Sequence, residues 1–242
     1  MQCPQQITYQ IRPGDTLYRL ARHYHTSVPA IMALNPAADP YNLQIGSELT
    51  ICPGEGSQSG CPNFEKQLEL MNTMRLVWLQ HVYWTRMLLI SIAERLGDLD
   101  AVTARLLQNP GDIARIFAVY YGHDVAGAIE QLLTEHLQIG AELITALRDG
   151  ETDKAVTLNH QWFENADKMA TAFSGVSPYY PLEDTRNMLY RHLDLTTQEV
   201  VKRLSADYPA DIEAFGAVED EALMMADSFS SGLMRQFPQM FI

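Results

Sequence analysis

The chain has 242 residues, 47% hydrophobic and 19% charged, which excludes disordered and collagen-like classes and predicts a packed core. Thirty acidic side chains outnumber 17 basic ones and give a formal net charge of -13, so no nucleic acid partner is expected, because a polyanion would be repelled. The richest apolar run, Met87 to Ala93, is much shorter than the roughly 20 residues that cross a bilayer, so no membrane span is expected.

The first six residues have neither the positive charge nor the apolar run of a secretory signal peptide. We therefore expect synthesis in the cytoplasm and no ordinary secretion.

The first 50 or so residues predict a small unit with the order strand, helix, helix, strand. Residues 7–11 alternate as a strand does, and Pro13-Gly14-Asp15-Thr16 then supplies a turn and a helix N-cap. Two short amphipathic helices follow, and Asn35-Pro36 ends the second of them. Residues 48–51 indicate the closing strand.

Composition and charge both change at residues 55–62, a cluster of Gly, Ser and Pro typical of a flexible linker. Residues 1–54 carry three basic and three acidic side chains, whereas the rest of the chain carries 14 basic and 27 acidic ones. The sequence therefore predicts two domains, residues 1–54 and 63–242, joined by residues 55–62.

The second domain is predicted to be helical almost throughout, because long amphipathic stretches alternate with short Gly, Asp and Pro stops. Asn109 is expected to be the N-cap of the third helix and Pro110 its first residue. Short connections between long helices favour an up-and-down antiparallel bundle. The fold class is thus multidomain α+β, a small βααβ domain followed by an all-α bundle. The expected helices are 63–96, 98–108, 110–121, 124–149, 152–173, 182–205 and 210–235.

Three histidines, His81, His136 and His192, fall on the apolar faces of three predicted helices, each about the same distance from its helix end. Equal distances from a turn mean equal height in an antiparallel hairpin. The following helices carry a polar group at that height, so a mid-bundle polar layer is predicted. These groups are Asp112, Asn165 with Asp167, and Asp227.

The first interpretation of this layer is a metal or small-ligand site made of His81, His136, Asn165 and His192, which would suit zinc, iron or manganese. The second is a set of buried histidines hydrogen-bonded to their neighbours. We favour the second and expect no metal or other cofactor, because the Glu-x-x-His pairs of di-iron bundles and the His-Glu-x-x-His motif are both missing.

Recognisable catalytic patterns are also missing. The sequence has no Gly-x-Ser-x-Gly motif, no phosphate-binding glycine loop with a lysine, and no cysteine after Cys61. Glu135, Glu142 and Glu199 would be the acids of a glycosidase, but a helical bundle rarely provides the cleft that a glycosidase needs. No catalytic residue is assigned, and a role other than an enzyme is favoured.

Several short motifs of the first domain resemble those of a LysM domain: Gly14-Asp15-Thr16-Leu17, Leu20-Ala21, Asn35-Pro36, Asn42-Leu43 and Gly46. The resemblance implies binding of N-acetylglucosamine units of peptidoglycan or chitin in a shallow groove. An alternative role for Asp15 or Thr16 is to cap the helix. Carried over by position, the groove consists of Gly14, Asp15, Thr16 and Leu17 on one side and Tyr41, Asn42, Leu43, Gln44 and Ile45 on the other.

The three cysteines are Cys3, Cys52 and Cys61, and they are interpreted as structural. Antiparallel pairing of the two strands would bring Cys3 near Cys52 and Cys61, so Cys3 and Cys52 are a candidate disulfide in an oxidising compartment. The alternative is three free thiols in a reducing cell.

The helical domain is similar to a helical protein family of Gram-positive, mostly spore-forming bacteria, which implies a cell-envelope or spore context and supplies no reaction. The resemblance covers nearly all of residues 64–242. Its segments include His81-Val82-Tyr83-Trp84-Thr85-Arg86, Glu135-His136-Leu137, Trp162-Phe163-Glu164-Asn165-Ala166-Asp167 and Met188-Leu189-Tyr190-Arg191-His192-Leu193.

The expected function is that of a peptidoglycan-binding protein whose LysM domain anchors the helical bundle to the cell wall or to the spore cortex or coat. Such a protein would meet peptidoglycan from inside the mother cell or after nonclassical export. Oligomerisation, or a protein partner held by the bundle, would add avidity to a weak groove. The alternative is a metal-dependent helical enzyme or sensor localised by the LysM domain.

Overall fold

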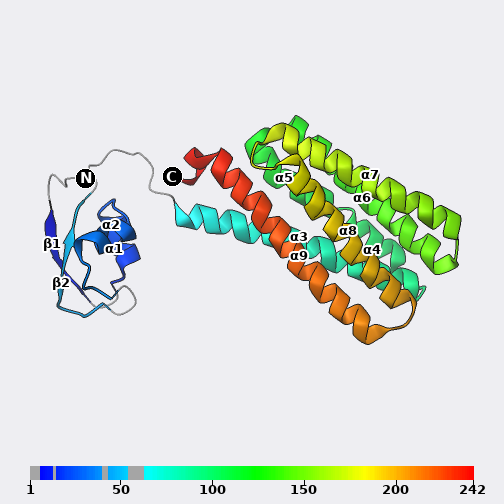
Figure 1. Ribbon diagram of the computed structural model, residues 1–242, viewed down its shortest axis with the longest axis horizontal. Coiled ribbons are helices and arrows are strands. Elements are labelled where there is room, and N and C mark those ends of the chain that lie inside the picture. Colours follow the sequence, from blue (N-terminus) through cyan, green and yellow to red (C-terminus); the bar gives the residue numbers. More distant parts are fainter. Residues whose placement is uncertain (1–5, 13–14, 40–42, 54–62) are drawn as a thin grey trace. The chain divides into compact units, whose positions relative to one another are not determined.

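The computed structural model describes residues 6–12, 15–39, 43–53 and 63–242. The chain divides into two compact units, Met1–Asn63 with Phe241–Ile242, and Phe64–Met240 (Figure 1). The first holds a two-stranded antiparallel sheet with helices and the second is all-helical, which confirms the predicted fold class. The predicted linker, residues 55–62, lies outside the described residues, so the domain limits at 54 and 63 stay a prediction.

The small unit has the predicted order of elements: β1 (Ile7–Gln10), α1 (Leu17–His23), α2 (Val28–Leu34) and β2 (Glu48–Ile51). The strands pair with Ile7 opposite Ile51 and Gln10 opposite Glu48. Side-chain caps start both helices, because Thr16 accepts from the backbone N–H of Arg19 and Ser27 accepts from that of Ala30. The core is aliphatic, and its buried members are Ile11, Leu17, Leu20, Ala21, Ile31, Leu49 and Ile51.

Asn35 ties the end of α2 to β2. Its Nδ2 donates to the carbonyl oxygens of Ile31 and Thr50, both at 2.7 Å, and its Oδ1 accepts from the backbone N–H of Thr50 at 2.8 Å. One side-chain amide thus satisfies backbone groups of two elements, including Thr50, which is 15 residues further along the chain. This network gives a physical reason for an asparagine where the second helix ends.

Cys52 follows β2 and is disulfide-bonded. The choice between a disulfide in an oxidising compartment and free thiols in a reducing cell stays a prediction. Cys3, the partner expected from the strand pairing, lies outside the described residues, as does Cys61.

The second unit contains seven α-helices among its described residues, at the positions predicted for them. Their ends differ from the predicted ones by a few residues; the first of them stops three residues early, before Arg95, whose positive φ of 53° breaks the helix. The helices are α3 (Phe64–Ala93), α4 (Leu99–Leu106), α5 (Asn109–Tyr121), α6 (His123–Asp149), α7 (Thr152–Val176), α8 (Leu182–Leu204) and α9 (Tyr208–Gln236), and a short 3-10 turn, η1 (Pro238–Phe241), follows.

The prediction that Asn109 is an N-cap was wrong. Asn109 is the first residue of α5, and Gln108 stands at the cap position without a side-chain cap hydrogen bond. The Asn109 side chain is fully buried and is hydrogen-bonded across the bundle to α3. Long-range partners in the core therefore outcompete the local capping interaction.

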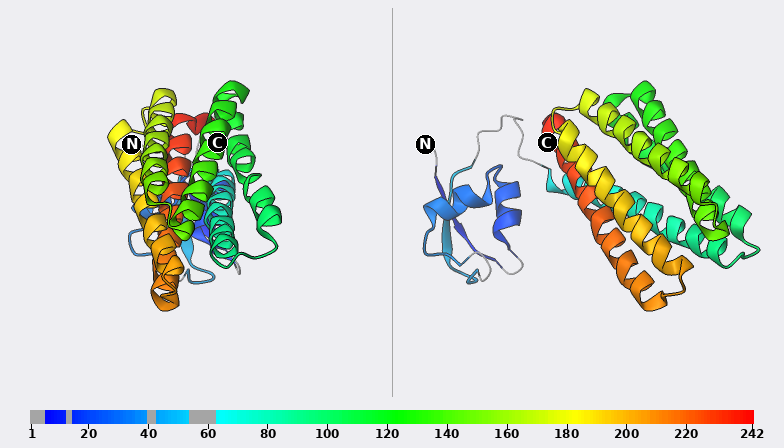
Figure 2. Two further views of the ribbon diagram at one scale, coloured as in Figure 1. Left: turned by 90° about the vertical axis from the view of Figure 1, so that its right-hand side faces the viewer. Right: turned by 45° about the vertical axis from the view of Figure 1, so that its right-hand side comes forward.

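The long helices of this unit lie roughly antiparallel to their neighbours (Figures 1 and 2). Each of α5 to α8 packs on the next helix along the chain, and α3 packs on α9 as well as on α4, α5 and α6. Helix α3 also contacts α8, and α6 contacts α8, so these three helices meet in the middle of the unit. No helix in the described part of the chain is long and apolar enough to cross a membrane.

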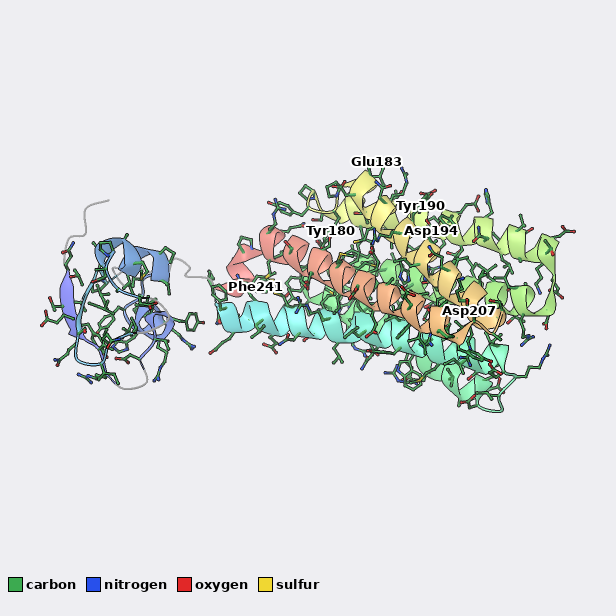
Figure 3. All side chains as sticks on the ribbon, turned by 60° about the horizontal axis from the view of Figure 1, so that its bottom comes forward. Tyr180, Glu183, Tyr190, Asp194, Asp207 and Phe241 are labelled. Carbon is green, nitrogen blue, oxygen red and sulfur yellow. The ribbon has the colours of Figure 1, made fainter. Side chains whose placement is uncertain are left out.

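One end of the helical core is aromatic. Trp78 stacks on Phe229 with ring centres 5.4 Å apart, and Phe117 and Phe173 pack against the same ring. The Tyr180 hydroxyl donates to the Phe229 carbonyl oxygen at 2.8 Å, which fixes the chain before α8 against α9 (Figure 3). The ring of Tyr180 lies so close to Gly232 that a Cβ there would be 2.1 Å from it.

The two glycines of α9 provide a matched test of this packing. Gly232→Ala is expected to destabilise the fold by about 1–3 kcal/mol, because the methyl group would displace the buried Tyr180 ring. Gly216→Ala in the same helix meets nothing within 4 Å and is expected to stabilise by up to about 1 kcal/mol through helix propensity. Urea denaturation of both variants measures the difference, and equal effects would contradict the close packing at Gly232.

Candidate functional site

The first expected glycan-binding loop is braced by Asp15. Its Oδ2 accepts from the backbone N–H of Arg12 and from the Tyr9 hydroxyl, both at 2.8 Å. The Arg12 backbone hydrogen bond is the main cause of a lowered Asp15 pKa, to which Tyr9 contributes. Thr16 is the cap of α1. Asp15 thus makes contacts with Tyr9 and Arg12, and Thr16 fixes the start of α1.

The remaining expected groove residues differ in what they present to solvent. Leu17 is 3% exposed and belongs to the core, so a glycan could reach only its backbone. Leu43 is half-buried against the same core, whereas Gln44 is exposed and Ile45 is 67% exposed. Gly14, Tyr41 and Asn42 lie outside the described residues. Of these described residues, Gln44 and Ile45 are thus the ones whose side chains are exposed enough to contact a glycan.

Two open depressions flank these loops. One, of about 390 Å³, is lined by residues 35–39 together with Leu43, Gln44 and Ser47. The other, of about 780 Å³, is lined by Asp15 and by basic side chains of α1 and the turn after it. The first has the size of a small-molecule site and mixes apolar and polar groups, as sugar binding requires. The two expected sides of the groove line different depressions.

The second candidate site lies inside the helical unit, where α3, α6 and α8 meet. These helices bring together His81, His136 and His192, whose ring centres are 5.8 Å, 5.8 Å and 6.0 Å apart. The three side chains are 2–4% exposed. One ring nitrogen from each lies within 4.8 Å of the other two. The structure therefore places all three sequence-selected histidines in one cluster.

Asn165 makes its hydrogen bonds outside the histidine cluster. Its Nδ2 donates to the Leu132 carbonyl oxygen and to Glu135, each at 3.1 Å, and its buried Oδ1 has no hydrogen-bond partner. The Trp162 ring, one turn earlier on α7, is the group that stacks on His136, with ring centres 5.2 Å apart.

The predicted carboxylates do not join the layer either. Each finds an arginine closer to the surface of the unit, where an ion pair costs less desolvation than it would in the core. The pairs are Asp112 with Arg115, Asp167 with Arg186, and Asp227 with Arg75.

The polar partner of the cluster is Asn109, which the sequence analysis placed at a helix cap. Its Nδ2 donates to the Val77 carbonyl oxygen at 2.8 Å, so its Oδ1 faces Nδ1 of His81 at 2.9 Å. An amide oxygen only accepts, so Nδ1 of His81 carries the proton and its Nε2 keeps a lone pair. The pair Asn109-Pro110 has the local pattern of an N-cap followed by the first residue of a helix. No signal in the neighbouring sequence shows that the Asn109 side chain points into the core instead.

Beside the three rings is a cavity of about 20 Å³, which has room for about one water molecule. Thr85 and Thr196 also line it, and each donates its hydroxyl hydrogen to the carbonyl oxygen one turn back, that of His81 or His192. Their oxygens can still accept. The other lining residues are apolar apart from the Trp162 indole, so no described group of fixed charge faces the imidazoles.

Burial keeps the imidazoles neutral. Desolvation lowers the pKa of His192 to about 3 and that of His136 well below its usual range, with repulsion from the neighbouring imidazoles adding to both. Burial also lowers the pKa of His81, although Asn109 opposes the shift. At neutral pH each ring thus has one nitrogen with a lone pair, which is the form that binds metals. Nδ1 of His136 and Nδ1 of His192 are both buried without a hydrogen-bond partner.

A charged network lies further along α8. Arg86 donates to Glu199 at 2.6 Å and to both oxygens of Asp211 at 2.8 and 3.1 Å, and Arg203 approaches Asp211 at 3.5 Å. Glu199 and Asp211 are 2% and 0% exposed. Burial raises the pKa of Glu199 to about 7, against the lowering effect of Arg86. The sequence points to Glu199 alone, because its partner Arg86 is 113 residues away in α3 and Asp211, which shares that arginine, lies in α9.

Comparison with known proteins bears on the first unit. The LysM domain family matches residues 9–51. This confirms the resemblance drawn from the loop motifs, and it indicates binding of a glycan such as peptidoglycan or chitin and association with a cell wall. No curated protein and no solved structure matches the chain. The resemblance of the helical unit to a family of spore-forming bacteria stays a prediction.

The raised pKa of Glu199 predicts a pH-dependent stability that Glu199→Gln removes. The folded chain binds the Glu199 proton more tightly than the unfolded chain does. The stabilisation that results is complete below pH 4.5 and is lost as the pH rises from 4.5 through about 7. Its full size is about 3 kcal/mol. Urea denaturation from pH 4.5 to 8 is expected to give a flatter profile for Glu199→Gln than for the unaltered chain.

Glu142→Gln, on an exposed position of α6, is the control and is expected to keep the original profile. Parallel profiles for Glu199→Gln and the unaltered chain would show that folding does not raise the pKa of Glu199.

Proposed function

We propose that this protein is a peptidoglycan-binding protein in which the LysM domain anchors the helical bundle to the cell wall or to a spore envelope layer. The observation that carries the proposal is the LysM match over residues 9–51. The chain supplies a binding domain at one end and a much larger all-helical unit after it.

The described loops support recognition of N-acetylglucosamine. Acetamido groups need backbone donors and acceptors and a small apolar contact for the methyl group. The loop around Gln44 and Ile45 offers the apolar contact, because Ile45 is an exposed aliphatic side chain, and Gln44 adds a polar side chain that lines the neighbouring depression. Asp15, Thr16 and the backbone of Leu17 complete the proposed groove, with Gly14, Tyr41, Asn42 and Leu43 as its other proposed members.

The helical bundle is then the part that is held at the glycan. A single LysM groove is shallow and binds weakly, so a second copy of the chain or a protein partner bound to the bundle would raise the apparent affinity through avidity. We propose synthesis in the cytoplasm, with contact to peptidoglycan from the mother-cell side or after nonclassical export. A metal-dependent role for the bundle is the second candidate, and the histidine cluster favours it.

Co-sedimentation of the full chain with insoluble peptidoglycan tests the proposal. We expect the unaltered chain to sediment, soluble N-acetylglucosamine oligomers to release it, and Ile45→Ser to bind at least about tenfold more weakly, which corresponds to roughly 1.4 kcal/mol.

Val156→Ser is the matched control, because Val156 is a β-branched residue of the helical unit with 66% exposure, close to the 67% of Ile45. It is expected to bind like the unaltered chain. No sedimentation of the unaltered chain with peptidoglycan or chitin would overturn the proposal, and equal loss in both variants would remove Ile45 from the groove.

A further inference from the structure

We propose that His81, His136 and His192 bind one divalent transition metal ion in the core of the helical unit, with zinc as the best-fitting ion. Within the described residues they form the one group of three or more potential ligands whose donor atoms lie near enough together to hold an ion. The inference is independent of glycan binding, since every residue that carries it belongs to the helical unit.

The donor set determines the kind of ion. Three neutral imidazoles offer nitrogen only, and no carboxylate lines the adjoining cavity. Magnesium and calcium prefer oxygen ligands, whereas zinc and its neighbours in the first transition row bind imidazole well. Zinc sites with three histidine ligands, and a fourth coordination position left for water or substrate, are also known.

The spacing of the rings is close to what such a site needs. Zinc at about 2.1 Å from each of three nitrogens in tetrahedral geometry places those nitrogens about 3.4 Å apart. The nitrogens here lie within 4.8 Å of one another, and the ring centres are nearly equidistant at 5.8, 5.8 and 6.0 Å. Small side-chain rotations would close the triangle, and the backbones of α3, α6 and α8 already converge on it.

Asn109 supports the first ligand in the way that outer partners support metal-binding histidines. Its oxygen holds the proton on Nδ1 of His81, and its own orientation is fixed by the Val77 carbonyl oxygen. The Nε2 lone pair of His81 is thereby left for a metal ion. Asn109 is a positioning residue in this account, because it reaches the ion only through His81.

The other two imidazoles lack such partners. Nδ1 of His136 and Nδ1 of His192 are buried without a hydrogen bond. A purely structural histidine in a protein core is normally hydrogen-bonded. These two unpaired nitrogens lie beside His81, whose proton position is fixed by Asn109. A metal ion that accepts their lone pairs explains this arrangement better than a purely structural role does.

The cavity provides the fourth position. Its volume of about 20 Å³ fits about one water molecule beside an ion held by the three rings. The hydroxyl oxygens of Thr85 and Thr196 line it with lone pairs still available, because both hydrogens are donated to backbone carbonyls. A water ligand could therefore donate to them.

The first test uses the full chain without a polyhistidine tag. After removal of metals with a chelator, zinc titration followed by elemental analysis is expected to give one zinc per chain, with a rise in Tm. Cobalt substituted for zinc is expected to give the strong visible absorption of a tetrahedral or five-coordinate nitrogen site. No zinc retained and no such cobalt spectrum in the unaltered chain would overturn the proposal, whatever the variants do.

Three variants separate a metal site from a structural histidine cluster. His192→Leu replaces an imidazole without an Nδ1 partner by an apolar side chain, so we expect it to fold without metal, to lose zinc binding and to gain no Tm from zinc. Asn109→Ala is expected to weaken zinc binding about 10–100-fold. His160→Ala is the control, because His160 is 75% exposed and pairs only with Glu164, and it is expected to keep the full stoichiometry.

Circular dichroism of each metal-free variant checks that it is folded before zinc is added. Zinc that stays at one per chain in folded His192→Leu, or that disappears in His160→Ala, would place the ion elsewhere and overturn the assignment. If His192→Leu does not fold, the cobalt spectrum of the unaltered chain decides, since surface histidines would not produce one low-coordinate site per chain.

Discussion

The main physical constraint on the middle of the helical unit is the burial of three neutral imidazoles where α3, α6 and α8 meet. A buried imidazole must stay uncharged, and an unsatisfied polar atom in a core costs about 1–3 kcal/mol. The structure meets the first condition by surrounding the rings with apolar groups and Trp162, and it meets the second for His81 through Asn109. It leaves Nδ1 of His136 and of His192 without partners. Such a cost in the middle of the core needs a compensating role, and metal binding supplies one.

Long-range periodicity made most of the fold predictable from sequence. Seven amphipathic stretches separated by short stops become seven helices, and equal distances from the helix ends correctly bring three histidines from three helices to one height. Asn109 was misassigned because capping rules describe local hydrogen bonds, whereas its partners are His81 and Val77. The Arg86 and Asp211 pair was missed for a similar reason, since 125 residues separate them and no local pattern connects them.

The small unit shows the same division between pattern and packing. Its order of elements and its LysM identity follow from short motifs, because turns, caps and a strand pair are local. The direction in which each groove side chain points is set by packing between separate elements and not by the local motif. Leu17 follows a loop motif yet lies in the core, whereas Ile45 extends into solvent, and only the packing of α1 against the sheet separates the two cases. A motif thus identifies the loop, and the fold decides which of its side chains face a ligand.

The most direct test of the imidazole cluster is nitrogen NMR of the full, metal-free chain with 15N-labelled histidine, assigned with single histidine variants. Long-range couplings distinguish Nδ1–H from Nε2–H tautomers and both from imidazolium. We expect His81 to carry its proton on Nδ1, as the Asn109 oxygen requires, all three buried rings to be neutral at pH 7, and His192 to be still neutral near pH 5.5. An Nε2–H tautomer for His81, or an imidazolium signal from any of the three at pH 7, would contradict the account.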